Sequence, residues 1–421
     1  MPSIRTRFIA LSLVLALIAA ACGSDDNTAT AESETTDSAD ESSADTSAAT
    51  SGGSYTLVDT GQVTCYDTSA AIDCPAEGEA FFGQDGEYLG DSPSYTDNGD
   101  GTITDDVTGL MWQQDPGDRT YYSDAVAGLD SFSLAGYDDW RLPSVKDLYS
   151  LYLGNGTDPL GPDIDESELT AFIDTDYFVF EYGDTRMIDS QWISSTIYES
   201  TVMGGQECFF GVNFADGRIK CYSTGGGPSG YFAIYVRGSS DYGENSFSDN
   251  GDDTIVDEAT SLIWQQQDNG AGIDWESALS YCSDLDLGGS DDWRLPNVKE
   301  LQSLVDYTRS PDTTDSAAID AMFETTSITN EAGEMDYPFF WSSTTHVSYP
   351  ESLTTADYVA FGRALGLVDG EWIDIHGAGA QRSDPKTGDP QDSYDRISES
   401  GDNNTLVDAI RIDNLVRCVQ G

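Results

Sequence analysis

The hexapeptide DDWRLP occurs twice, at residues 138–143 and 291–296, and each copy places two carboxylates beside a guanidinium. Such a group is a candidate catalytic set. The alternative is a structural role: the tryptophans anchor the core, the arginines pair with a carboxylate and the aspartates occupy a turn. We favour the structural role and expect no catalytic residue here. The residues are Asp138, Asp139, Trp140, Arg141, Asp291, Asp292, Trp293 and Arg294.

The segment DNGDG at residues 97–101, with its counterpart DNGDD at 249–253, could hold calcium, because alternating Asp, Asn and Gly present oxygen ligands on a tight loop. The spacing departs from the EF-hand pattern, since Thr96 and Val107 fall where carboxylates are needed. An ordinary turn before a strand is the alternative that we favour. Calcium is therefore an optional cofactor, with candidate ligands Asp97, Asn98, Asp100, Asp249, Asn250 and Asp252.

The two histidines, His346 and His376, lie outside any zinc or nucleophile motif. His376 opens a polar, glycine-rich segment, residues 376–396, for which the first half of the chain has no counterpart. Long loops on rigid domains often carry recognition. We predict a ligand-contact patch here; a solvated loop is the alternative. The candidate contact residues are His376, Gln381, Arg382, Asp384 and Lys386.

The charge balance is strongly acidic, with 18 Lys plus Arg against 76 Asp plus Glu and a formal net charge of −58. A surface of this sign repels nucleic acid, anionic lipid and sulfated polysaccharide unless cations intervene. We therefore exclude nucleic acid as a partner.

The first 22 residues have the pattern of an export signal, with Arg5 and Arg7 before an apolar stretch and small residues leading to Cys22. The pattern resembles a bacterial lipoprotein signal, which implies that Cys22 is lipidated; plain secretion is the alternative. Residues 23–54 are acidic and rich in Ser and Thr, which predicts a disordered tether. We expect an exported head that is anchored to a membrane by lipid, at the outer membrane or cell surface.

A repeat extends well beyond the hexapeptide. Residues 95–115 match 247–267 without a gap, and DDWRLPSVKDLYSLY matches DDWRLPNVKELQSLV. Further on, we align QWISST (191–196) with FWSSTT (340–345), GVNFADGR with YVAFGRAL, and YVRG (235–238) with LVRC (415–418). The period is far longer than that of a solenoid. It predicts two tandem domains, residues 95–238 and 247–419, with residues 55–94 as a lead-in packed on the first.

Six cysteines follow Cys22: Cys65, Cys74, Cys208, Cys221, Cys282 and Cys418. An even number in an exported chain predicts disulfides, although fifteen pairings are formally possible. Cys282 and Cys418 are absent together from the first copy, where our alignment places Leu129 and Gly238, so we pair them. Cys208 and Cys221 flank a predicted hairpin, which leaves Cys65 with Cys74. The alternative is that some cysteines stay free.

Each copy begins with two short apolar strands, TIT and LMW or TIV and LIW, followed by a helical stretch. After the hexapeptide, Ser144 or Asn297 can cap a second helix, with Asp147 or Glu300 completing a capping box. The rest of each copy reads as strands joined by glycine-rich turns. Two helices and an irregular antiparallel sheet predict an α+β fold class.

These motifs resemble the Lcl C-terminal domain family, named for a Legionella collagen-like adhesin. The resemblance is carried by DNGDGTITDDVTGLMWQ, DDWRLPSVKDL, WISST, VNFADGR and YVRG, with their second-copy counterparts. WRLP before a capped helix is also similar to formylglycine-generating enzymes, whose fold is C-type-lectin-like. The resemblance implies two tandem C-type-lectin-like domains.

The resemblance also implies a function: a cell-surface lipoprotein that acts as a non-catalytic binding or adhesion module for an extracellular carbohydrate or protein. The family's named member adheres to glycosaminoglycans, but the net charge of −58 opposes electrostatic capture of sulfated chains. No cofactor is required. The alternatives are a relative of formylglycine-generating enzymes, which use a reactive cysteine pair, and a structural subunit of a surface assembly.

Overall fold

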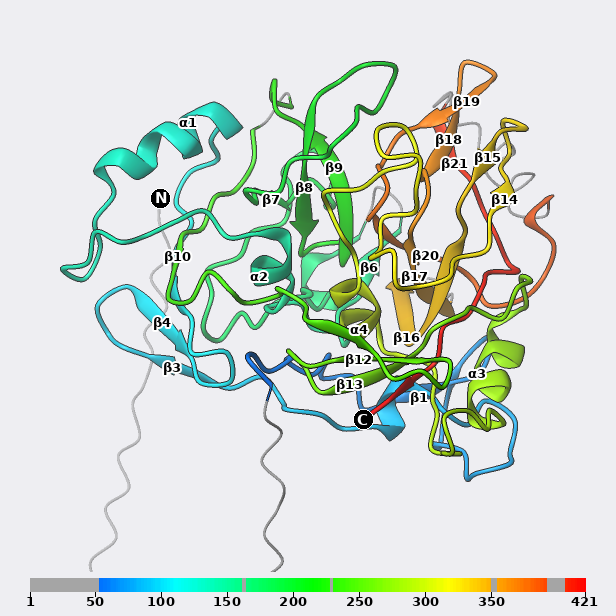
Figure 1. The fold of residues 1–421 in the computed structure, drawn as a ribbon. Helices are drawn as coiled ribbons and strands as arrows, with labels where there is room; N and C mark the ends of the chain where they lie inside the picture. Colours follow the sequence, from blue (N-terminus) through cyan, green and yellow to red (C-terminus); the bar gives the residue numbers. More distant parts are fainter. Residues whose placement is uncertain (1–52, 161–163, 228–229, 350–353, 392–405) are drawn as a thin grey trace, which may run out of the picture. The chain divides into compact units, whose positions relative to one another are not determined.

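A computed structural model describes residues 53–160, 164–227, 230–349, 354–391 and 406–421, all within one structural unit (Figure 1). The predicted signal segment with Cys22, and all but the last two residues of the tether, lie outside the described residues. Strands outnumber helices, so the α+β class is mostly β with few helices. Among the described residues, no helix is long and apolar enough to cross a membrane.

The lead-in and the first copy contain the following elements. The helices are η1 (Asp85–Glu87), α1 (Tyr122–Gly128), η2 (Leu129–Ser131), α2 (Val145–Tyr149) and η3 (Glu166–Glu168). The strands are β1 (Cys65–Tyr66), β2 (Ala71–Ile72), β3 (Tyr95–Asp97), β4 (Thr102–Asp105), β5 (Met111–Gln113), β6 (Asp158–Pro159), β7 (Gln191–Trp192), β8 (Cys208–Asn213), β9 (Arg218–Ser223) and β10 (Val236–Arg237).

The second copy repeats this plan with longer strands. Its helices are α3 (Trp275–Ser283) and α4 (Val298–Ser303). Its strands are β11 (Phe247–Asp249), β12 (Thr254–Asp257), β13 (Leu262–Gln265), β14 (Ile328–Thr329), β15 (Met335–Asp336), β16 (Phe339–Tyr349), β17 (Thr354–Ala360), β18 (Leu365–Val368), β19 (Glu371–Asp374), β20 (Gln381–Pro385), β21 (Leu406–Asp408) and β22 (Val419–Gln420).

Each copy opens with a four-stranded antiparallel sheet that its last strand completes. The orders are β10-β5-β4-β3 and β22-β13-β12-β11. Val236 pairs with Trp112 in the first sheet, and Val419 pairs with Trp264 in the second. Both tryptophans are fully buried. The ends of each copy are thus closed on one another around a tryptophan.

The hexapeptide forms the joint between this sheet and the second helix. Ser144 and Asn297 cap α2 and α4, and the acidic residue three positions later bonds back to the cap, as the sequence predicts. In the second copy that residue, Glu300, also accepts two hydrogen bonds of 2.6 Å from Arg294. The Arg141–Asp147 pair repeats this contact in the first copy. The motif therefore fixes the start of a helix.

Equivalent hydrogen bonds correct two parts of our repeat alignment. The amides of Ser195 and Ser343 bond to the carbonyls of Pro143 and Pro296, so WISST must shift by one residue against the predicted match. The carbonyls of Tyr235 and Cys418 accept from Gln113 and Gln265, which makes Tyr235 the counterpart of Cys418. Gly238, which we predicted as the counterpart of Cys418, is therefore wrong. The alignment matched the Val-Arg pairs of the two copies, although the two arginines occupy different places in the fold.

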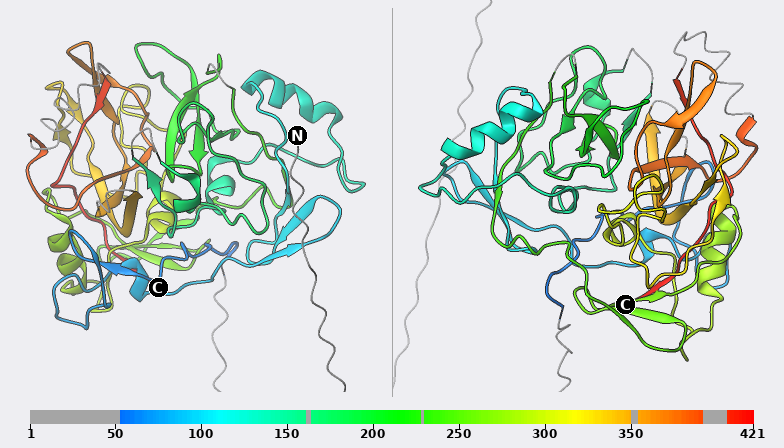
Figure 2. Two further views of the ribbon diagram at one scale, coloured as in Figure 1. Left: turned by 180° about the vertical axis from the view of Figure 1, so that it is seen from behind. Right: turned by 45° about the horizontal axis from the view of Figure 1, so that its top comes forward.

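The copies are joined through a seven-stranded sheet of order β6-β16-β17-β20-β9-β8-β7. Strands β6, β7, β8 and β9 come from the first copy, and β16, β17 and β20 from the second (Figures 1 and 2). β20 pairs with β17 as β9 pairs with β8, and Gln381 of β20 pairs with Ile219 of β9. The equivalent strands β9 and β20 therefore meet at this residue pair, with β7 and β8 on one side and β16 and β17 on the other.

Two lysines strengthen the joint, of which Lys299 is buried and Lys146 is partly buried. Lys146, at the start of α2, donates to the Ser303 carbonyl at the end of α4, and Lys299 of α4 donates to the Ser150 carbonyl after α2. Each lysine thus satisfies a carbonyl group at the C-terminus of the other copy's helix. Burial lowers the pKa of Lys146 to about 8 and that of Lys299 to about 7, with nearby carboxylates opposing the shift.

The lead-in contacts both copies, whereas we predicted that it packs on the first. Gln62 donates to the carbonyls of Gly154 in the first copy and Thr345 in the second. Asp85 accepts hydrogen bonds from Thr60 of the lead-in and Thr344 of β16. The reason is that residues 59–62 run along the seam where the two copies meet.

Candidate functional site

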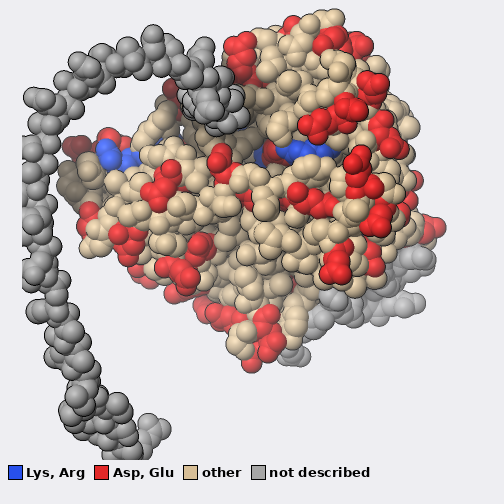
Figure 3. Space-filling model, turned by 90° about the horizontal axis from the view of Figure 1, so that it is seen from below, with Lys and Arg blue, Asp and Glu red and all other residues tan. Residues whose placement is uncertain are grey.

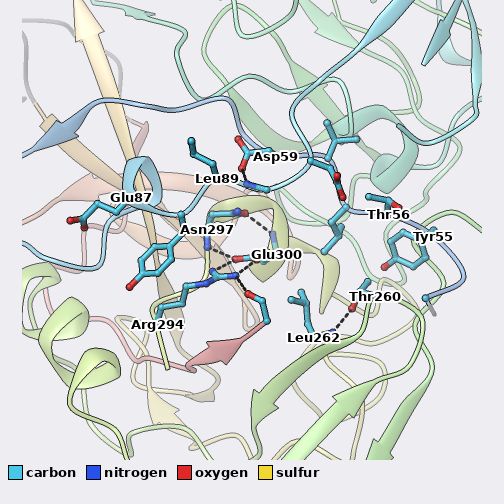
Figure 4. A pocket seen from close by; sticks show the side chains of 17 residues that line it. Tyr55, Thr56, Asp59, Glu87, Leu89, Thr260, Leu262, Arg294, Asn297 and Glu300 are labelled. Carbon is cyan, nitrogen blue, oxygen red and sulfur yellow. Dashed lines mark hydrogen bonds and ion pairs between the residues drawn. The ribbon is translucent and has the colours of Figure 1, made fainter. Parts of the chain in front are cut away.

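A cavity of about 460 Å³ lies between the lead-in and the second copy, and we take it as the candidate site (Figure 4). This volume falls in the range of ligand pockets. Its lining residues are Gly53, Tyr55, Thr56, Leu57, Val58, Asp59, Glu87, Tyr88, Leu89, Gly90, Asp91, Thr260, Leu262, Arg294, Asn297, Glu300 and Gly421.

The second hexapeptide supplies one wall of the cavity. Arg294 holds Glu300 by two hydrogen bonds of 2.6 Å and donates a third to the Gly421 carbonyl at 3.1 Å. Figure 4 shows this pair beside Asn297, with Leu262 and Thr260 to one side. Burial lowers the pKa of Arg294, but Glu300, with smaller contributions from Asp85 and Tyr88, raises the pKa above its usual value, so the guanidinium stays charged.

The lead-in supplies the opposite wall. Asp59 accepts from the backbone amides of Gly61 and Gly90, which ties the two lead-in segments together. The ring of Tyr88 lies 5.3 Å from the Arg294 guanidinium, and Leu89 is 69% exposed. The wall is thus held by backbone hydrogen bonds while its side chains remain accessible.

The charge of the cavity is negative. Four carboxylates line it, from Asp59, Glu87, Asp91 and Glu300, against the single guanidinium of Arg294. Figure 3 shows acidic side chains scattered over the face of the protein seen from below, with few basic ones. Such a cavity favours a ligand that carries positive charge. Beneath it, burial raises the pKa of Asp85 to about 7, against the opposing effect of its two threonine hydrogen bonds.

A second polar cluster is enclosed between the copies and has no access comparable to the cavity. Arg218 of β9 lies 2.7 Å from Asp158 of β6 and 3.6 Å from Asp216. His346 of β16 lies 3.1 Å from Asp357 and 3.4 Å from Asp158. Burial raises the pKa of Asp158, but Arg218 and His346 outweigh it and bring the pKa down to about 2. We assign this cluster to the joint.

Ligand contact by the predicted patch stays a prediction, and three of its five residues are buried in the fold. Gln381 and Asp384 lie in β20 with 0% and 4% exposure, and Lys386, which follows the strand, is 2% exposed. Gln381 bonds to Asp357, and Lys386 lies 3.8 Å above the Trp275 ring. The segment was predicted as an insertion, but residues 381–385 are the counterpart of β9.

The other two predicted contact residues pair with Asp408 of β21. His376 lies 2.9 Å from one carboxylate oxygen, and Arg382 bonds to the other. Burial and the nearby Arg382 lower the pKa of His376 to about 4. These side chains hold β21 to β20. Residues 392–396 of the predicted loop lie outside the described residues.

The candidate calcium ligands bond to their own loops. Asp97 and Asp249 accept from the amides of Gly99 and Gly251, and Asp100 accepts from the Thr102 hydroxyl. Asp252 accepts from the Thr254 hydroxyl in the same way, while Asn98 and Asn250 donate to Thr102 and Thr254. Over the described ranges, no group of three or more His, Cys, Asp or Glu side chains is placed to hold a metal. Calcium binding stays a prediction.

The hexapeptide residues take separate places. Trp140 and Trp293 are buried at 7% and 3% exposure, and their arginines bind the helix-start acids. Asp138, Asp139, Asp291 and Asp292 are exposed, and Asp139 forms an ion pair with Arg237. The carboxylates and arginine of one motif thus face different partners.

All six cysteines after Cys22 form the three predicted disulfides, which are confirmed. They are Cys65–Cys74, Cys208–Cys221 and Cys282–Cys418.

The sequence could have revealed one part of the joint that we missed. Lys146 and Lys299 occupy the same place in SVKDL and NVKEL, although lysine is seldom buried. A lysine repeated on the buried start of a helix is a readable signal. The cavity gave no such signal, because its lead-in wall, with Tyr88 and Asp91, has no counterpart in the repeat.

Comparison with known proteins supports the repeat. The family model described as the Lcl C-terminal domain matches residues 101–237 and again residues 253–369. Searches of curated proteins and of solved structures gave no match.

Proposed function

Because this chain belongs to the Lcl C-terminal domain family, in two tandem copies, we propose that it is a non-catalytic adhesion module for an extracellular protein or carbohydrate. We further propose that Cys22 carries a lipid that anchors it at the outer membrane or cell surface. The family is an adhesin type, which supports a surface-binding module rather than an enzyme.

The observation that carries the proposal is the family match in both copies. Three disulfides within the same structural unit add to it. Disulfides form and persist outside the reducing cytosol. A cross-linked head on a long acidic tether suits a protein that meets its ligand beyond the membrane. The acidic surface favours ligands that are neutral or basic.

We also propose that each copy has a C-type-lectin-like fold. Two features support this assignment. Each copy has two α-helices, and its last strand pairs antiparallel with a strand near its start. An experimental structure of one copy that superimposes on another fold class would overturn the assignment.

A binding screen tests the function. Residues 53–421 should bind at least one component of a panel of glycans and extracellular-matrix proteins, and the screen should be run with and without calcium. Silence under both conditions would contradict the adhesion module. Whole cells carrying Cys22→Ser should lose the binding that cells with the unaltered chain show, because the head would be released; unchanged binding would contradict the lipid anchor.

A further inference from the structure

We propose that Lys146 and Asn245 are joined by an isopeptide bond, which ties helix α2 of the first copy to the segment that leads into β11 of the second. The reaction links the lysine nitrogen to the side-chain amide carbon of Asn245 and releases ammonia. Asp257, at the end of β12, relays the proton. This modification goes beyond the proposed binding function and does not depend on it.

The side-chain amide of Asn245 lies between an amine and a carboxylate. Lys146 Nζ donates to Asn245 Oδ1 at 3.0 Å, and Asn245 Nδ2 donates to Asp257 Oδ2 at 2.9 Å. These partners fix which end of the amide is oxygen, because a lysine ammonium offers only donors and an aspartate carboxylate only acceptors. The attacking nitrogen thus lies against the carbonyl group, and the leaving nitrogen lies against the carboxylate.

Lys146 can supply a neutral amine, which is the form that attacks a carbonyl carbon. Its three hydrogen bonds go to uncharged oxygens, those of the Asn245 amide and of the Gly243 and Ser303 carbonyls. Burial lowers its pKa to about 8, against the opposing effect of nearby carboxylates. With that pKa, about one Lys146 side chain in ten is uncharged at pH 7.

Asp257 is held in place to move the proton. Its side chain is fully buried. Besides the amide nitrogen of Asn245, it accepts hydrogen bonds from the backbone amides of Ser246 and Ala259 and from the Thr260 hydroxyl. These bonds keep the carboxylate against the leaving nitrogen, as a general base and acid must be.

The reaction balances without a further reactant. Neutral Lys146 has two protons on Nζ when it attacks Cγ of Asn245. As the Cγ–Nζ bond forms, Asp257 takes one of them and gives it to Nδ2. The Cγ–Nδ2 bond then breaks, and the other proton stays on the new amide. Ammonia leaves through the cavity of about 430 Å³ that Lys146 and Asn245 both line.

The other lysine of the joint shows what the reaction requires. Lys299 holds the same place in NVKEL, and the gapless match of the first block makes Asp105 the counterpart of Asp257. Extending that match by two residues towards the N-terminus places Pro93 where Asn245 stands. Lys299 donates instead to two backbone carbonyls. The lysine and the acid are therefore both present in this second place, but the side-chain amide is missing.

Peptide mapping of the unaltered full chain by mass spectrometry tests the inference. After reduction of the disulfides, trypsin should not cleave after Lys146, and the peptide that contains it should be joined to the peptide that contains Asn245. The joined pair should weigh about 17 Da less than the two peptides together, which is the mass of ammonia. The peptides around Lys299 should be unmodified in the same digest, which is the matched control.

Two variants test the roles of the residues. Lys146→Arg keeps a cation but cannot form this bond, so two separate peptides should appear. Asp257→Asn keeps the shape of the side chain without its proton acceptor and should lower the linked fraction at least about tenfold. Circular dichroism checks that both variants fold.

Separate peptides from the unaltered protein overturn the proposal, and this result does not depend on the folding of any variant. An equal linked fraction in folded Asp257→Asn overturns the proton relay.

Discussion

Replacing Arg218 with Met should lower the free energy of unfolding by about 3–5 kcal/mol, because it leaves the buried Asp158 carboxylate without its guanidinium partner. Arg218 lies 2.7 Å from Asp158, and it also donates to Ser383 of β20. Both carboxylates within its reach, Asp158 and Asp216, are at most 3% exposed. The substitution removes a contact between the copies, and urea denaturation measures its cost.

Arg186→Met is the matched control. Arg186 pairs with Asp189 within one loop, and its side chain is 63% exposed. Exposed pairs contribute about 0–1 kcal/mol, so this variant should unfold close to the wild type. Equal losses in the two variants would show that the Arg218 cluster does not hold the copies together.

Removing the Cys282–Cys418 disulfide, by Cys282→Ala with Cys418→Ala, should cost about 5 kcal/mol. The bond joins residues 136 apart in sequence, and closing so long a loop restricts the unfolded chain strongly. The two cysteines connect α3 to the segment that leads into β22. Denaturation of the double variant beside the wild type gives the loss.

Cys65→Ala with Cys74→Ala provides the comparison. Its cysteines are 9 residues apart, for which the same chain-entropy relation gives about 2.5 kcal/mol. The longer loop should therefore cost about twice as much. A loss for Cys282–Cys418 that is no greater than this would mean that loop closure is not the source of its stabilisation.

Repetition within the sequence made much of each copy predictable. The two capping boxes, the helices that they start and the strands around Trp112 and Trp264 follow from short local patterns. The Cys282–Cys418 pairing followed from the absence of both cysteines in the first copy. That conclusion was correct, although the alignment misplaced the first-copy counterpart of Cys418. In the first copy, Leu129 and Tyr235 fill the space that the disulfide takes in the second.

The place of β20 in the fold could not be predicted, because its contacts depend on residues distant in sequence, both in its own copy and in β9. The strand QRSDP looks like a solvated loop, but Gln381 is buried against Asp357, and Arg382 pairs with Asp408. The repeat alignment was misled in a similar way, because it matched two arginines, Arg237 and Arg417, that have different surroundings. Arg237 bonds to the exposed Asp139, whereas Arg417 is buried and donates to backbone carbonyls.

The central claim is that the two family copies form one structural unit, through β9–β20 pairing, exchanged lysine contacts and the lead-in. Scanning calorimetry of residues 53–421 with disulfides intact tests this most directly. We predict one transition whose calorimetric enthalpy equals its van't Hoff enthalpy. Two resolved transitions, one for each copy, would contradict the claim.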